Sequence, residues 1–454
     1  MIGGDVLISD MRMKHSHSTA STLLYYRVDQ SGSNVNYPFK NHNADSNAHK
    51  KSFFRILNIL IKVSVATDPF LIGNIFKCGY LWNAILFVFF CVLTEFSFFI
   101  LIQSWIYGRA YSYNEIWHEL FGNKSPSWII LVVVIINYAT LIIWNQNELS
   151  QYVEQTITLF WSDTPSILTN KWFLTYLLSA IFFLPPLFVK KLSNFSVISM
   201  IGNFFLIVAF VCLIFYFFHS LIKFDVSFAT VAEVQGLKSF KSNVFDIFHT
   251  IQTINIAIFC HPVLSVLVQD FDNPTRSRLM KLTWVSTAFS LVIHFFAGFF
   301  SYLINPENEG NIFYEMEIYN SDGSKIIFPE VIIGQISVYI VSILTNIIYI
   351  HFISRKIAEF ILPKAAESIV SVFFCGLTAI LFTSAMNFIG DEVFDIFDLI
   401  GGVTSMMLTY VFPSVYYFYQ YRFSNKVFGI VSVCLIIIGI GLSIALLVLG
   451  ILEY

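Results

Sequence analysis

Apolar stretches alternate with short polar loops from about residue 50 to the end of the chain. A helix of about 20 residues is long enough to cross the ~30 Å of hydrocarbon in a bilayer. The strict alternation that marks the short strands of a membrane β-barrel is absent. The pattern therefore predicts eleven transmembrane helices, at about residues 53–76, 80–104, 128–145, 172–189, 196–221, 247–268, 282–304, 331–353, 368–388, 399–419 and 427–450.

The first 50 residues have a different character. They are rich in Ser, Asn and His and contain no apolar run of the kind found in a secretory signal peptide. We expect residues 1–50 to form a disordered tail and residues 51–454 to form the membrane domain. Basic residues outside the predicted spans divide 18 to 6 in favour of the side that carries this tail. Because short cytoplasmic loops are enriched in Lys and Arg, the N-terminus is predicted to be cytoplasmic.

The composition agrees with a polytopic membrane protein. Hydrophobic residues make up 56% of the 454 residues and charged residues only 12%, whereas soluble proteins have about 25% charged residues. The net charge of −3 argues against nucleic-acid binding, which depends on neutralising phosphates. Nearly all six Cys lie in apolar runs, where they resemble small hydrophobic residues rather than a disulfide framework. The partner that the composition indicates is the lipid bilayer.

The first predicted span contains an unusual number of polar side chains, namely Arg55, Asn58, Lys62 and Asp68. Ionisable residues inside a membrane are expensive to bury and therefore mark functional sites. The first three share one helical face. Pro69 removes an amide donor and disfavours helical geometry at the residue before it, so we expect the helix to break at about residues 66–69. A simple proline kink is the alternative.

The sixth predicted span is also interrupted, because Cys260, His261 and Pro262 lie midway along it. Two interrupted spans five helices apart indicate an inverted-repeat transporter whose site lies between discontinuous helices. Half-helix ends hold a carboxylate at the positive end and a cation at the negative end, which suits a zwitterion. The pattern predicts two five-helix repeats and one extra helix, at about residues 53–222, 246–420 and 427–451.

The eighth predicted span carries a polar stripe that includes Ser342, Thr345 and Asn346. Hydroxyl and amide oxygens suit an ion such as Na⁺. Hydrogen bonding between helices is the alternative, since these residue types commonly join membrane helices.

Several stretches of the chain resemble the amino acid/auxin permease family, and most closely its sodium-coupled neutral amino acid transporter branch. Phe259–Ile304 is similar without gaps to the branch's Phe-x-Cys-His-Pro sixth helix and the basic loop that follows. Phe394–Tyr417 is similar to the tenth span of the family, and Asn58 and Pro69 fall on its first-helix Asn and Pro.

This resemblance implies an eleven-helix, two-repeat fold of the LeuT type, a cytoplasmic N-terminus and secondary transport of neutral amino acids. It implies a plasma, endolysosomal or vacuolar membrane. It also carries an ion-binding role to Asn58 and to Thr345 or its neighbours Ser342 and Asn346. No further cofactor is expected beyond Na⁺ or H⁺ as a coupling ion.

The chain departs from the family where Lys62, Val63 and Ser64 replace a Gly-Ser-Gly segment. Lys62 would either supply a fixed ammonium in place of a coupling cation or fill the site and favour sensing over transport. We predict that it pairs with Glu95 of the second span or with Asp68, since an unpaired charge at that depth is costly.

The two breaks and the resemblance together predict transport by alternating access around a central site. The substrate carboxylate is expected at the amides of Val63, Ser64, Val65 and Ala66. The substrate ammonium is expected at the carbonyls of Phe259, Cys260 and His261.

Two other functions remain open. A divalent-metal transporter of the same architecture would use Asp68, Cys260 and His261 as ligands. A non-transporting amino acid sensor would signal through its cytoplasmic tail. An enzyme is not expected, because the chain has no paired nucleophile and base and no glycine-rich phosphate loop at a membrane face.

Overall fold

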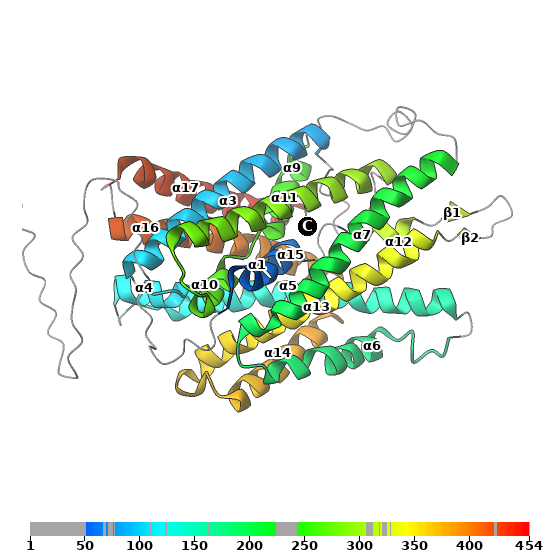
Figure 1. The fold of residues 1–454 in the computed structure, drawn as a ribbon, viewed down its shortest axis with the longest axis horizontal. Coiled ribbons are helices and arrows are strands. Elements are labelled where there is room, and N and C mark those ends of the chain that lie inside the picture. The colour runs from blue at the N-terminus through cyan, green and yellow to red at the C-terminus, as the bar shows by residue number, and fades with distance from the viewer. Residues whose placement is uncertain are drawn as a thin grey trace, which may run out of the picture. The chain divides into compact units, whose positions relative to one another are not determined.

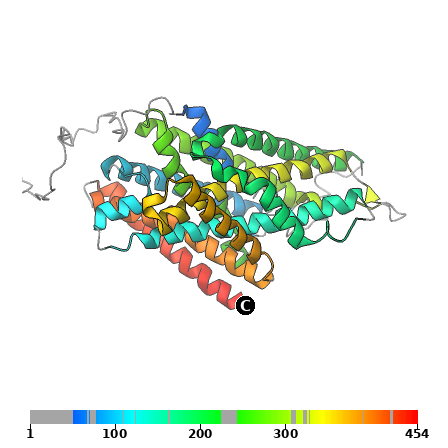
Figure 2. The same ribbon diagram turned by 90° about the horizontal axis from the view of Figure 1, so that it is seen from below.

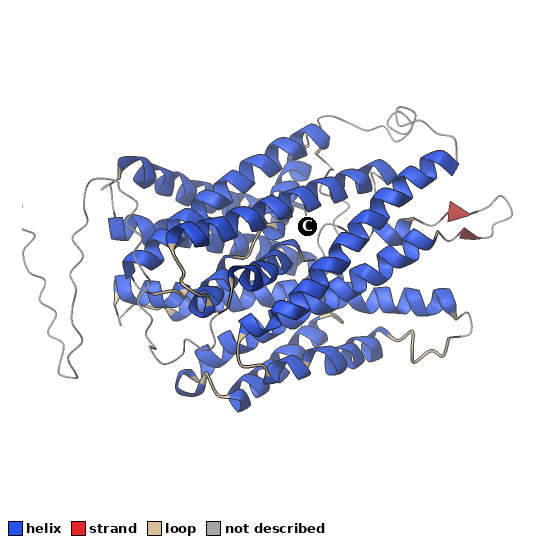
Figure 3. Ribbon diagram, in the orientation of Figure 1, coloured by secondary structure: helices blue, strands red, loops and turns tan. Residues whose placement is uncertain are grey.

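The backbone is almost entirely helical (Figure 3). The computed structural model of the protein describes residues 51–66, 70, 76, 78–108, 110–122, 125–161, 164–223, 243–305, 312–316, 318–319, 325–326, 328–389, 391–421 and 425–453. The predicted disordered tail at 1–50 and the candidate residue Asp68 lie outside these described residues.

Ten helical segments among the described residues are long and apolar enough to cross a membrane. They correspond in order to the second to eleventh predicted spans. Their elements are α3 (Tyr80–Gly108), α5 (Trp128–Phe160), α6 with η3 and η4 (Lys171–Phe188), η5 with α7 (Leu192–Lys223), α9 with α10 (Val244–Asp270), α11 (Arg276–Ile304), α13 (Pro329–Ile361), α14 (Ile369–Met386), α15 with η7 and α16 (Asp391–Tyr421) and α17 (Lys426–Glu453).

The first predicted span is represented by the shorter helix α1 (Phe53–Val65), since most of residues 67–77 lie outside the described part. Four smaller elements connect the spans: the helices α4 (Tyr113–Phe121), α12 (Ile312–Glu315) and η6 (Pro363–Ala365), and an antiparallel hairpin of β1 (Ile318–Tyr319) and β2 (Lys325–Ile326).

The short helix α1 packs among longer helices in the middle of the bundle (Figures 1 and 2). It lies against α11 and α7, while α13 packs along α7 and α5, and α11 packs along α3. By contrast, α17 packs only on its inner side and exposes large apolar residues such as Ile437 and Ile451. Such a face is suited to lipid, where exposed apolar side chains carry no penalty.

Both expected helix breaks are confirmed. The helix α1 ends at Val65, and Ala66 adopts a φ of 45°, a region that residues with a side chain rarely visit. In the sixth predicted span, α9 (Val244–Ala257) ends and α10 (His261–Asp270) begins after three non-helical residues, with Pro262 in the first turn of α10. Proline fits this position because the first helical amides have no partner inside the helix.

Candidate substrate and ion site

The broken ends of α1 and α9 meet at one side chain of α11. The last carbonyls of a helix have no partner within it and must find one elsewhere. The Ser290 hydroxyl lies within hydrogen-bond distance of two carbonyl acceptors, that of Ser64 at 3.1 Å and that of Ala257 at 3.4 Å. Tyr349 of α13 donates to the Val63 carbonyl over 3.1 Å. Hydroxyls from α11 and α13 therefore lie at the carbonyls that the two breaks release, with the one proton of Ser290 shared between two of them.

Charge is distributed unevenly around this meeting point. The C-terminal ends of α1 and α9 both carry partial negative charge, and the N-terminal end of α10 carries partial positive charge. His261 opens α10, is fully buried and stacks on Phe98 with ring centroids 3.8 Å apart. Within the described part of the chain, neither ring nitrogen of His261 has a hydrogen-bond partner. The arrangement brings two negative helix ends and one positive end to one place, as binding of a zwitterion requires.

The segment expected to supply amides to a carboxylate supplies carbonyls instead. Val63, Ser64 and Val65 belong to the last turn of α1, where amides bond back along the helix, and the Ala66 amide bonds to the Lys62 carbonyl over 3.0 Å. Substrate binding at these four amides stays a prediction, and it would require the last turn of α1 to open. Because this segment contains no glycine, α1 continues through Val63–Val65, and the amides of these residues bond within the helix.

The ammonium site also differs in detail from the prediction. The Cys260 carbonyl accepts the amide of Leu264 as the first helical bond of α10. The carbonyl that the break offers to another element is that of Ala257, three residues earlier. Phe259 packs against Tyr138, with ring centroids 5.9 Å apart, and thus contributes an apolar wall.

Lys62 is fully buried between α1, α7 and α13. Its stem passes over Gly202 of α7 so closely that an added Cβ there would lie 2.8 Å from Lys62 Cε and 2.9 Å from Cδ. The same point is 3.6 Å from the Cβ of Leu344 on α13. A residue without a side chain is therefore required at position 202 for Lys62 to lie where it does.

The pair expected between Lys62 and Glu95 does not form among the described side chains. Glu95 of α3 instead accepts a hydrogen bond from Thr283 of α11 over 3.1 Å. The alternative pair, with Asp68, falls outside the described residues. Glu95 thus belongs to the α3–α11 interface, whereas Lys62 contacts α7 and α13, because successive faces of α1 pack on different helices.

The polar stripe of α13 lies on the Lys62 side of the bundle. Ser342, Thr345 and Asn346 are fully buried, and Leu344, which lies between them in sequence, packs at Gly202 of α7, the residue that the Lys62 stem crosses. Thr345 donates to its own helix at the Val341 carbonyl over 2.8 Å. In the described part of the chain, the Ser342 hydroxyl and the Asn346 amide have no hydrogen-bond partner, so their oxygens are available to an ion.

The Asn58 backbone is fixed by α7. Its carbonyl accepts from the Asn203 amide over 2.9 Å, which ties α1 to the residue beside Gly202.

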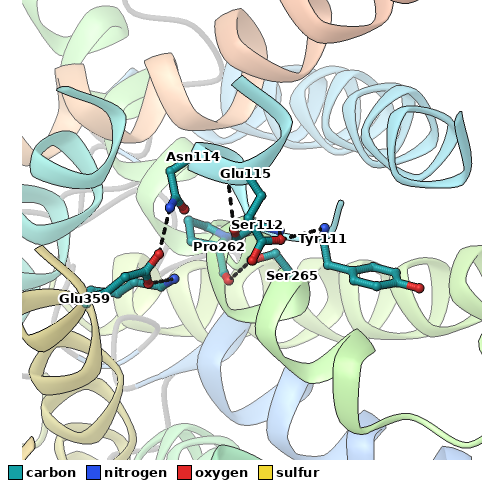
Figure 4. Close-up of polar contacts among 8 residues, drawn as sticks. Tyr111, Ser112, Asn114, Glu115, Pro262, Ser265 and Glu359 are labelled. Atoms are coloured by element: carbon teal, nitrogen blue, oxygen red, sulfur yellow. Dashed lines mark hydrogen bonds and ion pairs between the residues drawn. The ribbon is translucent and has the colours of Figure 1, made fainter. Parts of the chain in front are cut away.

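A polar network surrounds the first turn of α10 at its neighbours α4 and α13 (Figure 4). A capping box between Ser112 and Glu115 starts α4. Asn114 in the first turn of α4 donates to Glu359 of α13 over 2.7 Å, and Ser265 donates to the Pro262 carbonyl over 2.6 Å. This network holds α4 across the end of α13.

A comparison with protein-family models covers the described helices from α3 to α17. The family model for transmembrane amino acid transporter proteins matches residues 73–452. The chain belongs to this family. The match begins after α1, so the candidate residues Asn58, Lys62 and Val63–Ala66 lie outside it.

Solved structures show the fold that this transporter family member adopts. Mhp1, a nucleobase-cation-symport-1 family transporter in a closed conformation with bromovinylhydantoin bound, is 12% identical with a TM-score of 0.54, covering 90% of this chain and 95% of its own. MhsT in complex with L-phenylalanine is 11% identical with a TM-score of 0.52, and the match covers 84% of this chain and 97% of MhsT. A manganese transporter mutant from Eremococcus coleocola is 11% identical with a TM-score of 0.50, covering 88% and 93%. The expected LeuT-type architecture is thereby confirmed.

Sequence reasoning missed the partners that α11 and α13 contribute to the breaks, above all Ser290 and Tyr349. A signal for α11 exists in the sequence. Polar residues recur along one helical face of the seventh predicted span, at Thr283, Ser286, Thr287, Ser290 and His294.

Proposed function

We propose that this transmembrane amino acid transporter carries neutral amino acids by alternating access, with an ion or proton as the coupling partner. The observation that supports this proposal most directly is the meeting of the Ser64 and Ala257 carbonyls at Ser290. A substrate ammonium donates three hydrogen bonds and would take over both carbonyls from the single hydroxyl that now lies between them.

The neighbouring side chains favour a substrate without charge on its side chain. Phe98, Tyr138 and Phe259 line the break with aromatic rings. A charged group placed against them would lose its hydration without gaining a partner, whereas an apolar or amide side chain would lose little. The positive end of α10 would face the substrate carboxylate.

Alternating access requires groups of helices that move together. Lys51, just before α1, forms a parallel β-bridge with Phe271, just after α10. The Lys51 amide donates to the Asp270 carbonyl over 2.9 Å, and the Lys51 carbonyl accepts from the Asp272 amide over 3.0 Å. The start of α1 and the end of α10, which both lie away from the breaks, are therefore joined, and the two helices would move as one body. Asp270 fastens this body to the segment before α7, through Lys191 at 3.1 Å and Ser193 at 2.7 Å. With the N-terminus in the cytoplasm, these contacts close the cytoplasmic side.

Lys62 provides a basis for the coupling proposal. Its buried position against Gly202 of α7 is one where a fixed ammonium would stand in for a coupling cation. A transporter with this substitution would work without Na⁺, and Lys62→Gly would introduce Na⁺ dependence.

Counterflow in liposomes tests the proposed function. Purified protein is reconstituted into vesicles preloaded with an unlabelled amino acid, and entry of the labelled form is measured for alanine, leucine, glutamine and phenylalanine. Exchange of at least one of them above protein-free vesicles is expected. Absence of exchange for every neutral amino acid, together with uptake of Mn²⁺, would contradict amino acid transport and favour a metal carrier.

A further inference from the structure

A buried stripe of hydroxyl groups runs along α11 and ends in an imidazole. Its members are Thr283, Ser286, Thr287, Ser290 and His294, all buried and spaced three or four residues apart on one face. The stripe begins at Glu95 of α3 and passes the Ser64 hydroxyl, which lies 2.9 Å from that of Ser286. It therefore connects a buried carboxyl group to the two broken helix ends.

The Glu95 carboxyl lies in surroundings that favour its neutral form. The Thr283 hydroxyl donates to Glu95 Oε2 over 3.1 Å. The other oxygen, Oε1, is buried and has no hydrogen-bond partner in the described part of the chain. A carboxylate buried with one oxygen lacking a donor loses more hydration free energy than the neutral acid does.

The hydrogen bond of the His294 ring to a backbone carbonyl fixes its tautomer. Its Nδ1 lies 2.8 Å from the Ser290 carbonyl, which is only an acceptor, so Nδ1 carries the hydrogen. The other nitrogen, Nε2, then holds the lone pair of a neutral ring. It is buried and has no hydrogen-bond partner in the part of the chain that the structure describes. His294 Nε2 thus holds a buried lone pair to which no described group donates.

The charged surroundings of the two groups are sparse. Glu95 acts electrostatically on the thiols of Cys91, on the same helix, and Cys260, before α10. From η7, Tyr410 contacts Thr94 next to Glu95, and Arg276 of α11 stacks on Phe99 one turn along α3. Phe87 of α3 packs against His294 with ring centroids 6.4 Å apart.

No described basic side chain forms an ion pair with Glu95. A bare carboxylate would therefore stand uncompensated inside the membrane, which costs several kcal/mol.

We propose that Glu95 binds the coupling proton of transport, and that the hydroxyl stripe of α11, with the neutral His294 at its end, links Glu95 to the substrate at the helix breaks. This inference rests on the proposed function, because a coupling proton needs a substrate to move with it. Closing the carrier buries Glu95, and burial requires the neutral acid. A proton taken up from one compartment therefore accompanies the closing step and leaves from Glu95 to the other compartment when the carrier opens there.

The link to the substrate runs through Ser290. Its hydroxyl contacts His294 Nδ1 at 3.1 Å and the Ser64 carbonyl at 3.1 Å. An ammonium that takes over the carbonyls displaces the Ser290 hydroxyl, and this shift reaches Glu95 along the stripe, so substrate binding and protonation of Glu95 influence one another. The coupling is reciprocal, as linkage requires.

The test compares two kinds of uptake in the same proteoliposomes. Counterflow of the labelled amino acid without any gradient reports transport, and accumulation driven by a one-unit pH gradient reports coupling. One proton per substrate over that gradient supports about tenfold accumulation. The variants are Glu95→Gln, whose amide imitates the protonated acid, and His294→Asn, whose amide keeps a donor near the Ser290 carbonyl. Glu148→Gln on α5 is the matched control, since Glu148 bonds to Tyr152 away from the stripe.

We expect Glu95→Gln to keep counterflow and to lose pH-driven accumulation, together with the acidification that a trapped pH dye records when substrate enters. His294→Asn should reduce the accumulation, and Glu148→Gln should leave it unchanged. Accumulation that persists in Glu95→Gln, or a wild-type protein that exchanges substrate but ignores the pH gradient, would overturn the inference. Absence of counterflow in the wild type would instead overturn the proposed function.

Discussion

The close approach of Lys62 to Gly202 makes a quantitative prediction. In Gly202→Ala, the new Cβ would lie 2.8 Å from Lys62 Cε and 2.9 Å from Cδ, distances that force the lysine stem to move. Overpacking of a dense core costs about 1–3 kcal/mol, and a flexible stem places the expected loss near the lower end, at about 1 kcal/mol. Displacing the stem also shifts the ammonium, so ion-independent transport should fall.

A double-mutant cycle isolates this contact. Thermal unfolding in detergent is measured for Gly202→Ala, Lys62→Ala and the combined variant, with Gly441→Ala as the control. Gly441 lies on α17, and a Cβ there meets nothing within 4 Å. Gly441→Ala should be neutral or slightly stabilising, because alanine favours a helix over glycine by about 1 kcal/mol.

Once Lys62 is alanine, the clash is gone and Gly202→Ala should cost nothing. The coupling energy between the two positions should then be about 1 kcal/mol, within the range for residues in contact. Equal destabilisation by Gly202→Ala in both backgrounds would refute the assigned position of the lysine stem.

Three further predictions concern the helix breaks. Tyr349→Phe leaves the Val63 carbonyl without its donor, so stability in a thermal unfolding assay should fall by about 1–3 kcal/mol, and an unchanged melting temperature would contradict the contact. Ser290→Ala should weaken substrate binding by about tenfold in counterflow, an effect of about 1.4 kcal/mol, while Ser290→Thr should retain most of it; equal affinities of the two variants would argue against a role for the hydroxyl. Asp270→Asn should lose the ion pair with Lys191 at little cost in stability, because that pair is partly exposed. Amide hydrogen exchange in α10 should nevertheless become faster. Exchange protection equal to that of the wild type would show that Asp270 does not hold α10 to the segment before α7.

The helix pattern was accessible to sequence reasoning because each span is a local property. Apolar length alone locates a membrane helix, and ten of the eleven predicted spans have counterparts among the described helices. The breaks were equally accessible, since proline acts on its immediate neighbours. Pro262 marks the start of α10 in the sequence and in the structure alike.

The partners across the bundle were not accessible. Lys62 and Glu95 lie at similar predicted depths, and depth alone suggested a pair. Depth does not determine which way a side chain points around the helix axis. The packing of α1 directs Lys62 toward α7, whereas Glu95 accepts a hydrogen bond from Thr283 of α11. The amides of Val63–Ala66 bond within α1 for a local reason, because the helix runs to Val65 before it breaks.

The sequence by itself determined that the chain spans a membrane many times and that two of its spans are interrupted, because both properties depend on neighbours along the chain. Only the tertiary structure decided what the interruptions face. Ser64, Ala257 and Ser290 come from three separate spans, and their meeting depends on how those spans pack. A helix must satisfy its last carbonyls, but which distant hydroxyl does so is set by packing and not by local sequence.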